Sequence, residues 1–190
     1  MPAVAHSQPS MTADEFLAWE RAQEGRYEFI EGVVHAMAGA SVPHEESTGN
    51  LYTALRGALG PRGCMVYHSG VKVPVGNNYF YPDIVVRCRP RDPGFDAITE
   101  PVLLAEVLSP STQQYDQSAK WKFYQRLPSL QSFLLIEQDQ VAVHVYRRSG
   151  AVWIYSSHVS REDVIVLDDP ACSLQVGDLY AGIEGLAQNF

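Results

Sequence analysis

YPDIVVRC at residues 81–88 and, after a polar loop, PVLLAEVLSPSTQQYDQSAKWKFY at residues 101–124 form the stretch that decides the fold. Its two lone acids, Asp83 and Glu106, each stand beside an apolar run of β type. These runs predict two buried strands, each with a carboxylate at its edge. Because a bare carboxylate is costly there unless something pairs with it, a hard divalent cation such as Mg²⁺ is a candidate partner.

The segment after Glu106 has helical spacing. Asp116, Lys120 and Tyr124 recur at intervals of four and therefore share one face of a helix predicted from about Tyr115 to Arg126. We expect this helix to bring Lys120 over the two carboxylates. A metal would lower the pKa of a bound water, and the lysine would orient that nucleophile and offset charge in the transition state of phosphodiester hydrolysis.

The helix residues also have plainer interpretations. Asp116 and Lys120 could form an exposed helix pair worth about 0.3–0.5 kcal/mol. Tyr124 could be a core residue whose hydroxyl orients Lys120. Lys122 is the alternative lysine, and because a helical turn takes about 3.6 residues, it points well away from Lys120. Asp83 itself is compatible with a strand-end acid that caps a loop.

The motifs taken together are similar to a known family. They are Tyr-Pro-Asp at 81–83, Ala-Glu-Val-Leu-Ser-Pro-Ser-Thr at 105–112, the Asp116, Lys120 and Tyr124 spacing, Arg-Tyr-Glu-Phe-Ile-Glu-Gly at 26–32, His44, and Ser-Phe-Leu-Leu-Ile-Glu at 132–137. In this order they resemble the Uma-type endonucleases of bacteria, which belong to the restriction-endonuclease-like PD-(D/E)xK superfamily. The resemblance covers most of the chain.

The resemblance implies a DNA substrate and a Mg²⁺ or Mn²⁺ cofactor. It implies Asp83 and Glu106 as metal ligands, with the Val107 carbonyl as a third oxygen and Lys120 as the catalytic lysine. The superfamily expects a lysine two positions after the second acid, where this chain has Leu108. An active site therefore needs its lysine on another element.

Four residues are expected at the periphery of this site: Glu28, His44, Asp116 and Tyr124. Glu28 is the acid that matches the family upstream, and it could point toward the site. His44 stands in the first turn of a predicted helix, where a capping role competes with a role in the site.

Composition suits one domain over residues 11–190 after a flexible tail at 1–10, because 190 residues with 46% hydrophobic content can bury a substantial core. The three cysteines are odd in number, far apart and form no CxxC pattern, so neither a disulfide framework nor a zinc ribbon is expected, and a reducing cytoplasm fits best. No apolar run is long enough to span a membrane, and the N-terminus does not resemble a signal peptide.

The net charge of −8 argues against tight nonspecific DNA binding. Basic residues still cluster locally, with three arginines between positions 87 and 91, and Lys120, Lys122 and Arg126 on the predicted helix. The acidic balance and the displaced lysine both permit a second class, a nuclease fold kept as a non-catalytic binding or assembly module. A homodimer is a further expectation, from the frequency of two-fold assemblies and the convenience of cutting two strands.

Local patterns predict an α/β (α+β) fold, a mixed central sheet flanked by helices. Thr12 to Glu15 forms a capping box for a helix that ends near Gly25. A second helix runs from about His44 to Leu59 with Ser41 as its N-cap. The expected strands are a hairpin at 26–30 and 33–37, a β-meander over 65–67, 71–75 and 79–88, the strand before Glu106, a run at 132–136, 141–147 and 152–158, and a short strand at 164–167 before a closing helix at 178–187.

Overall fold

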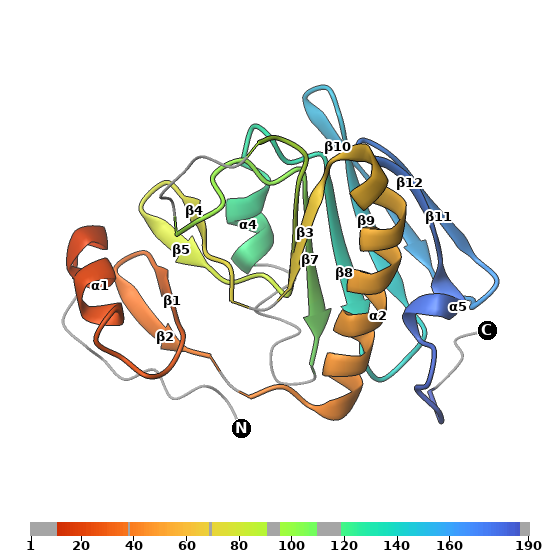
Figure 1. Cartoon of the computed structure of the whole chain (residues 1–190), viewed down its shortest axis with the longest axis horizontal. Coiled ribbons are helices and arrows are strands. Elements are labelled where there is room, and N and C mark those ends of the chain that lie inside the picture. Colours follow the sequence, from red (N-terminus) through yellow and green to blue (C-terminus); the bar gives the residue numbers. More distant parts are fainter. Residues whose placement is uncertain (1–10, 38, 69, 91–95, 110–118, 187–190) are drawn as a thin grey trace.

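The structure, a computed structural model, describes residues 11–37, 39–68, 70–90, 96–109 and 119–186. Within these ranges the α-helices are α1 (Ala13–Glu20), α2 (Val42–Leu59), α4 (Trp121–Tyr124) and α5 (Val176–Leu179), and the 3₁₀-helix η1 spans Gly60–Arg62. The strands are β1 (Tyr27–Ile30), β2 (Val33–Ala36), β3 (Met65–His68), β4 (Val73–Val75), β5 (Asn78–Phe80), β6 (Ile84–Arg87), β7 (Leu103–Leu108), β8 (Ser132–Glu137), β9 (Val143–Ser149), β10 (Val152–His158), β11 (Val164–Asp168) and β12 (Ala171–Gln175). The predicted mixed sheet flanked by helices is confirmed (Figure 1).

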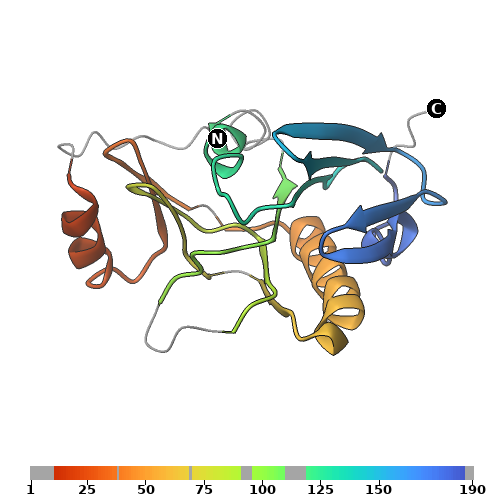
Figure 2. The ribbon, with the colours of Figure 1, turned by 90° about the horizontal axis from the view of Figure 1, so that it is seen from above.

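A six-stranded sheet in the order β10-β9-β8-β7-β6-β3 forms the centre of the molecule. Its β7 and β8 pair in parallel, and the other neighbours pair antiparallel. A four-stranded sheet in the order β2-β1-β5-β4 lies at the end where α1 packs, and β11 and β12 form a third, two-stranded sheet near α2 (Figure 2).

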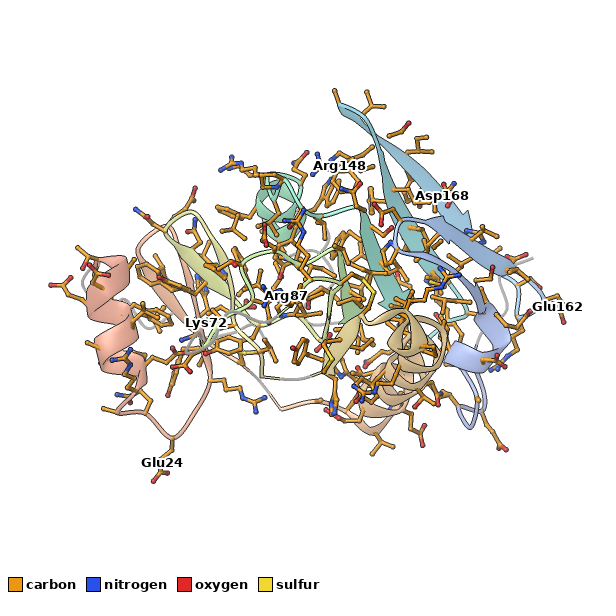
Figure 3. All side chains as sticks on the ribbon, turned by 45° about the horizontal axis from the view of Figure 1, so that its top comes forward. Glu24, Lys72, Arg87, Arg148, Glu162 and Asp168 are labelled. Carbon is orange, nitrogen blue, oxygen red and sulfur yellow. A yellow bond between two sulfur atoms is a disulfide. The ribbon has the colours of Figure 1, made fainter. Side chains whose placement is uncertain are left out.

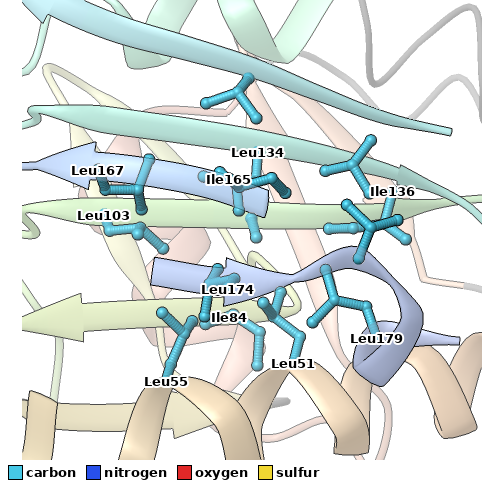
Figure 4. Close-up of a cluster of buried hydrophobic side chains, with 14 of the residues drawn as sticks. Leu51, Leu55, Ile84, Leu103, Leu134, Ile136, Ile165, Leu167, Leu174 and Leu179 are labelled. Atoms are coloured by element: carbon cyan, nitrogen blue, oxygen red, sulfur yellow. The ribbon is translucent and has the colours of Figure 1, made fainter. Parts of the chain in front are cut away.

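The first face of the central sheet packs against α2, α5 and the β11–β12 ribbon. Leu51, Leu55 and Leu59 recur along α2 at intervals of four and are completely buried. They meet alternate residues of the central strands, such as Ile84 and Leu103 (Figure 4). Burial of each leucine contributes about 1.5–3 kcal/mol, so this stripe fixes the helix to the sheet.

The opposite face packs against α4 and the four-stranded sheet. Phe80 of β5, Tyr124 of α4 and Leu104 of β7 lie in one buried cluster on this side. The Phe80 and Tyr124 rings meet edge to face with centroids 5.2 Å apart. The two larger sheets therefore share a hydrophobic core, and residues of β7 that point to this face lie between them.

The N-terminal elements follow the local patterns closely. Thr12 and Glu15 form the predicted capping box, although α1 ends at Glu20 rather than near Gly25. The hairpin is confirmed, and its turn residues Glu31 and Gly32 have φ of 50° and 87°, the left-handed conformation that two-residue hairpin turns require.

The predicted meander over 65–88 is wrong. The run expected as one strand divides at Tyr81-Pro82-Asp83, so that β5 pairs with β4 and β1 while β6 pairs with β3 and β7. Pro82 explains the break, because proline has no N–H for a ladder and restricts the residue before it.

The C-terminal region contains a strand that the local patterns missed. β11 pairs with β12, and the closing helix is the single turn at Val176–Leu179 instead of the expected 178–187, whose last residue lies outside the described ranges. The expected tail at 1–10 lies outside them too.

The expectation of unpaired cysteines is also wrong, because Cys64 and Cys88 form a disulfide. β3 and β6 pair with Met65 opposite Arg87, so the next residues outward in that register are these two cysteines. In the described part of the chain, no helix combines the length and the apolar character needed to cross a membrane.

Candidate active site

The register of β6 against β7 brings the two predicted metal ligands together. Ile84 lies opposite Ala105, so one residue further in the same register Asp83 lies opposite Glu106. Glu106 shares the face of Leu104, which is the face toward α4, whereas Asp83 lies just before β6 and its carboxylate contacts the Val107 N–H and His44 of α2. Cross-strand neighbours have Cβ atoms about 4.5–5.5 Å apart, and like charges at that spacing are destabilising. The pair therefore needs positive charge nearby.

Asp83 is held by groups from two other elements. Its Oδ2 accepts a hydrogen bond of 2.7 Å from the backbone N–H of Val107 and lies 3.2 Å from Nε2 of His44. His44 stands in the first turn of α2, where the side chain of the N-cap Ser41 accepts a hydrogen bond from its N–H. The helix cap thus fixes the imidazole against the carboxylate.

The backbone of Val107 contributes to the same place. In the β6–β7 register Val107 lies opposite Pro82, which has no N–H to donate to the Val107 carbonyl. The N–H of Val107 points toward β6, and in an extended strand the carbonyl of the same residue points to the same side. Its oxygen is therefore directed toward the Asp83 side of β7.

Glu106 is at the centre of a buried ionic cluster. Lys120 Nζ lies 3.2 Å from Glu106 Oε1 and 3.0 Å from Glu28 Oε1. Tyr124 donates a 2.7 Å hydrogen bond from its hydroxyl to Glu106 Oε1. The Lys120, Glu28 and Glu106 side chains are 7%, 6% and 4% exposed, so one ammonium bridges two carboxylates almost out of contact with solvent.

The hydroxyl of Tyr124 acts here as a hydrogen-bond donor. Complete burial raises its pKa well above the usual value, the nearby Glu106 carboxylate raises it further, and the Lys120 ammonium opposes the shift. The phenol therefore stays protonated at neutral pH and orients Glu106.

Most of the predicted site residues come together. Lys120 and Tyr124 both reach Glu106, as expected for one helix face. Glu28, expected at the periphery, contacts the lysine directly. Asp116 lies outside the described residues. Lys122, the alternative lysine, is exposed and does not share the Lys120 position.

Tyr81 was missed by the sequence reasoning. Its backbone N–H donates to Glu28 Oε1 at 3.1 Å, and its hydroxyl donates to Glu20 of α1. Burial and the Glu20 carboxylate raise the pKa of Tyr81, which keeps it a donor. Its position directly before Pro82-Asp83 could have identified Tyr81 as a residue close to the site.

The donor set suits a hard divalent cation. Two opposed carboxylates and a directed backbone carbonyl are oxygen ligands of the kind that Mg²⁺ prefers, with water and phosphate completing the shell. In the described part of the chain, His, Cys, Asp and Glu side chains form no group of three or more that could hold a metal by themselves. Any metal held at this place would therefore need ligands beyond these side chains, such as main-chain oxygens, water or phosphate.

Comparisons with known proteins bear on both the family and the fold. Residues 13–177 match the Uma2 family, described as "Putative restriction endonuclease". Two uncharacterised proteins of Synechocystis are similar: slr1290 is 32% identical over 188 residues, covering 95% of this chain and 98% of that protein, and sll1609 is 36% identical over 147 residues, covering 74% and 82%. A solved structure from Anabaena variabilis, described as a putative nuclease belonging to DUF820, has a TM-score of 0.77 at 21% identity and covers 90% of this chain and 98% of that chain.

Proposed function

Because the chain belongs to the Uma2 putative restriction endonuclease family, we propose that it is a metal-dependent endonuclease that hydrolyses DNA phosphodiester bonds. The observation that carries the proposal is the β6–β7 register, which when extended one residue beyond Ile84 and Ala105 brings Asp83 opposite Glu106, with the Lys120 ammonium 3.2 Å from Glu106. Two acids and a lysine are the groups that metal-assisted phosphodiester hydrolysis needs.

The carboxylates of Asp83 and Glu106 and the Val107 carbonyl would hold Mg²⁺ or Mn²⁺. A metal there would act as a Lewis acid toward the phosphate and lower the pKa of a bound water. Leu108 is completely buried, so the lysine that the superfamily places at this position is supplied here by Lys120 from the start of α4.

The remaining residues would keep this arrangement in place. Glu28 of β1 pairs with Lys120, and Tyr124 of α4 donates its hydrogen bond to Glu106 of β7. His44 holds Asp83 in one orientation. Lys120 would orient the attacking water and offset negative charge that develops on the phosphate.

A second candidate function is a non-catalytic binding or assembly module with the same fold. The net charge of −8 favours it, because nucleic-acid binders usually carry a basic surface. We further propose that the chain acts as a homodimer, since two-fold assemblies are the commonest.

The decisive experiment is cleavage of supercoiled and single-stranded DNA with Mg²⁺, Mn²⁺ or EDTA. We expect cleavage with either metal and none with EDTA. Asp83→Asn, Glu106→Gln and Lys120→Met should each lower the rate at least about 100-fold, as loss of a group that stabilises transition-state charge does.

Matched controls separate catalysis from stability. Lys122→Met removes an exposed lysine of the same helix, and Glu100→Gln removes an exposed carboxylate that pairs with Arg89. Both should keep full activity, and circular dichroism should show every variant folded. If no DNA is cut under any condition and calorimetry detects no Mg²⁺ or Mn²⁺ binding, the non-catalytic module is the correct function.

A further inference from the structure

Four aromatic side chains form a continuous row beside the candidate active site: Trp121, Tyr146, Trp153 and Tyr155. We call this row the aromatic ladder. In the β9–β10 register Tyr146 lies opposite Tyr155 and Trp153 lies opposite Arg148, so these side chains share one face of the ribbon. That face is the one toward α4, because Trp121 of α4 packs on it.

The rings of the ladder contact one another in sequence. Trp121 stacks on Tyr146 with centroids 4.5 Å apart and meets Trp153 edge to face at 4.8 Å. Tyr146 in turn lies 5.2 Å from Tyr155. Beneath them Trp121 stacks on the buried Phe133 at 5.4 Å, which fixes the row to the core.

The outer end of the ladder is open to solvent. Tyr155 is 53% exposed on β10, the edge strand of the central sheet, and Trp121, Tyr146 and Trp153 are partly exposed. The Tyr155 hydroxyl lies 2.8 Å from His144 Nδ1, which holds the ring in place. Packing in the hydrophobic core explains the inner rings, but it does not explain why the solvent-exposed Tyr155 ring is held in place.

Basic groups accompany the ladder although the chain as a whole is acidic. Arg148, labelled in Figure 3, has its guanidinium 4.4 Å from the Trp153 ring centroid and donates hydrogen bonds to the carbonyls of Gln125, Leu127 and Leu130. Arg126 is exposed in the turn after α4, with its guanidinium 5.4 Å from the Phe123 ring centroid. Aromatic rings beside cations are how proteins bind single-stranded nucleic acid, because every base has a face that can stack and every nucleotide carries a phosphate.

The ladder is continuous with the candidate site. Trp121 directly follows Lys120, whose ammonium contacts Glu106, so one helical turn carries both the proposed catalytic lysine and the first ring of the ladder. The ladder thus begins one residue along the chain from the proposed catalytic lysine.

We propose that the aromatic ladder binds single-stranded DNA by base stacking and that the preferred substrate is therefore an unpaired strand. This proposal rests on the proposed nuclease function for its choice of DNA. In a duplex the base faces are already stacked on each other, so the rings of the ladder cannot stack on them and we expect weaker binding.

The test is binding of a fluorescein-labelled oligothymidylate, and of the same strand annealed to its complement, measured by anisotropy in EDTA. Tyr155→Ala should weaken binding of the single strand about 5- to 150-fold, which corresponds to the loss of one stacked base, and should leave duplex binding unchanged. Tyr155→Phe keeps the ring but loses the contact with His144, and should bind within about twofold of wild type.

Ile154→Ala is the matched control. Ile154 is 47% exposed on the same strand but points to the opposite face, so its removal should not affect binding. Equal binding by Tyr155→Ala and Ile154→Ala, or an equal loss for single strand and duplex, would overturn the proposal.

Binding is measured without metal, so this result is independent of cleavage. Ring-dependent binding of the single strand without cleavage would sink the nuclease function and leave the ladder proposal standing. If Tyr155→Ala cleaves DNA as fast as wild type and binds the single strand equally well, the nuclease function stands and the ladder proposal is wrong.

Discussion

Lys120→Met tests the central physical claim about the site, which is that this ammonium neutralises two buried carboxylates. The lysine makes ion pairs of 3.0 Å with Glu28 and 3.2 Å with Glu106, and all three side chains are at most 7% exposed. Methionine has a similar length and no charge, so it fills the space and leaves both carboxylates without this ammonium.

The expected cost is about 3–5 kcal/mol of unfolding free energy, the usual penalty for removing one partner of a buried ion pair. A solvated helix pair, the alternative interpretation of Lys120, would cost only about 0.3–0.5 kcal/mol. The two interpretations therefore differ about tenfold in energy. That difference is well above the error of a denaturation experiment.

The assay is urea denaturation followed by circular dichroism at neutral pH. Lys122→Met, which removes an exposed lysine of the same helix, should change the unfolding free energy by less than about 0.5 kcal/mol. Adding Glu28→Gln to Lys120→Met should recover part of the loss, because one of the two uncompensated carboxylates is then neutral. A cost below about 1 kcal/mol for Lys120→Met, with no coupling to Glu28, would refute the bridging arrangement.

The disulfide, the buried tyrosine and the proposed metal ligands each give a further prediction. Under denaturing, non-reducing conditions only Cys172 should react with a thiol reagent, and reduction should expose all three thiols. Breaking the Cys64–Cys88 bond, which spans 24 residues, should cost about 3 kcal/mol in the same urea assay. Burial raises the pKa of Tyr124 in the folded state, so its contribution to stability is complete below the pKa of an unfolded tyrosine, about 10, and is lost as the pH rises toward the folded-state pKa. The urea midpoint of Tyr124→Phe should therefore fall less than that of wild type between about pH 9 and 11. Magnesium at about 100 times its Kd should raise the unfolding free energy of wild type by about 2.7 kcal/mol, measured by thermal denaturation. Asp83→Asn should abolish this gain. If the variant gains as much stability as wild type, the metal binds elsewhere.

Much of the local structure could be predicted because its causes are local. The capping box of Thr12 and Glu15 starts α1, and Ser41 starts α2. Likewise the leucine repeat of α2 and the turn at Glu31–Gly32 depend on residues a few positions apart. Periodicity and capping chemistry act over such distances, so the chain reveals them without its partners.

Errors arose where pairing between distant strands decides the outcome. The run over 79–88 looked like one strand, but its two halves joined different sheets on either side of Pro82. Cys64 and Cys88 looked unrelated until the β3–β6 register set them face to face. β12 carries a weak pattern of its own and exists as a partner of β11.

The sequence by itself determined which groups the candidate site would contain. Asp83 and Glu106 interrupt or border apolar runs, and Lys120 and Tyr124 share a helical spacing, so residue type and position, together with the family resemblance, singled out all four as candidates. Only the tertiary structure decided how they meet: the β6–β7 register puts the two acids opposite each other, and Glu28 reaches Lys120 from another sheet. The physical reason is that residue type and spacing are written along the chain, whereas register and contact depend on how separate elements bury their apolar faces together.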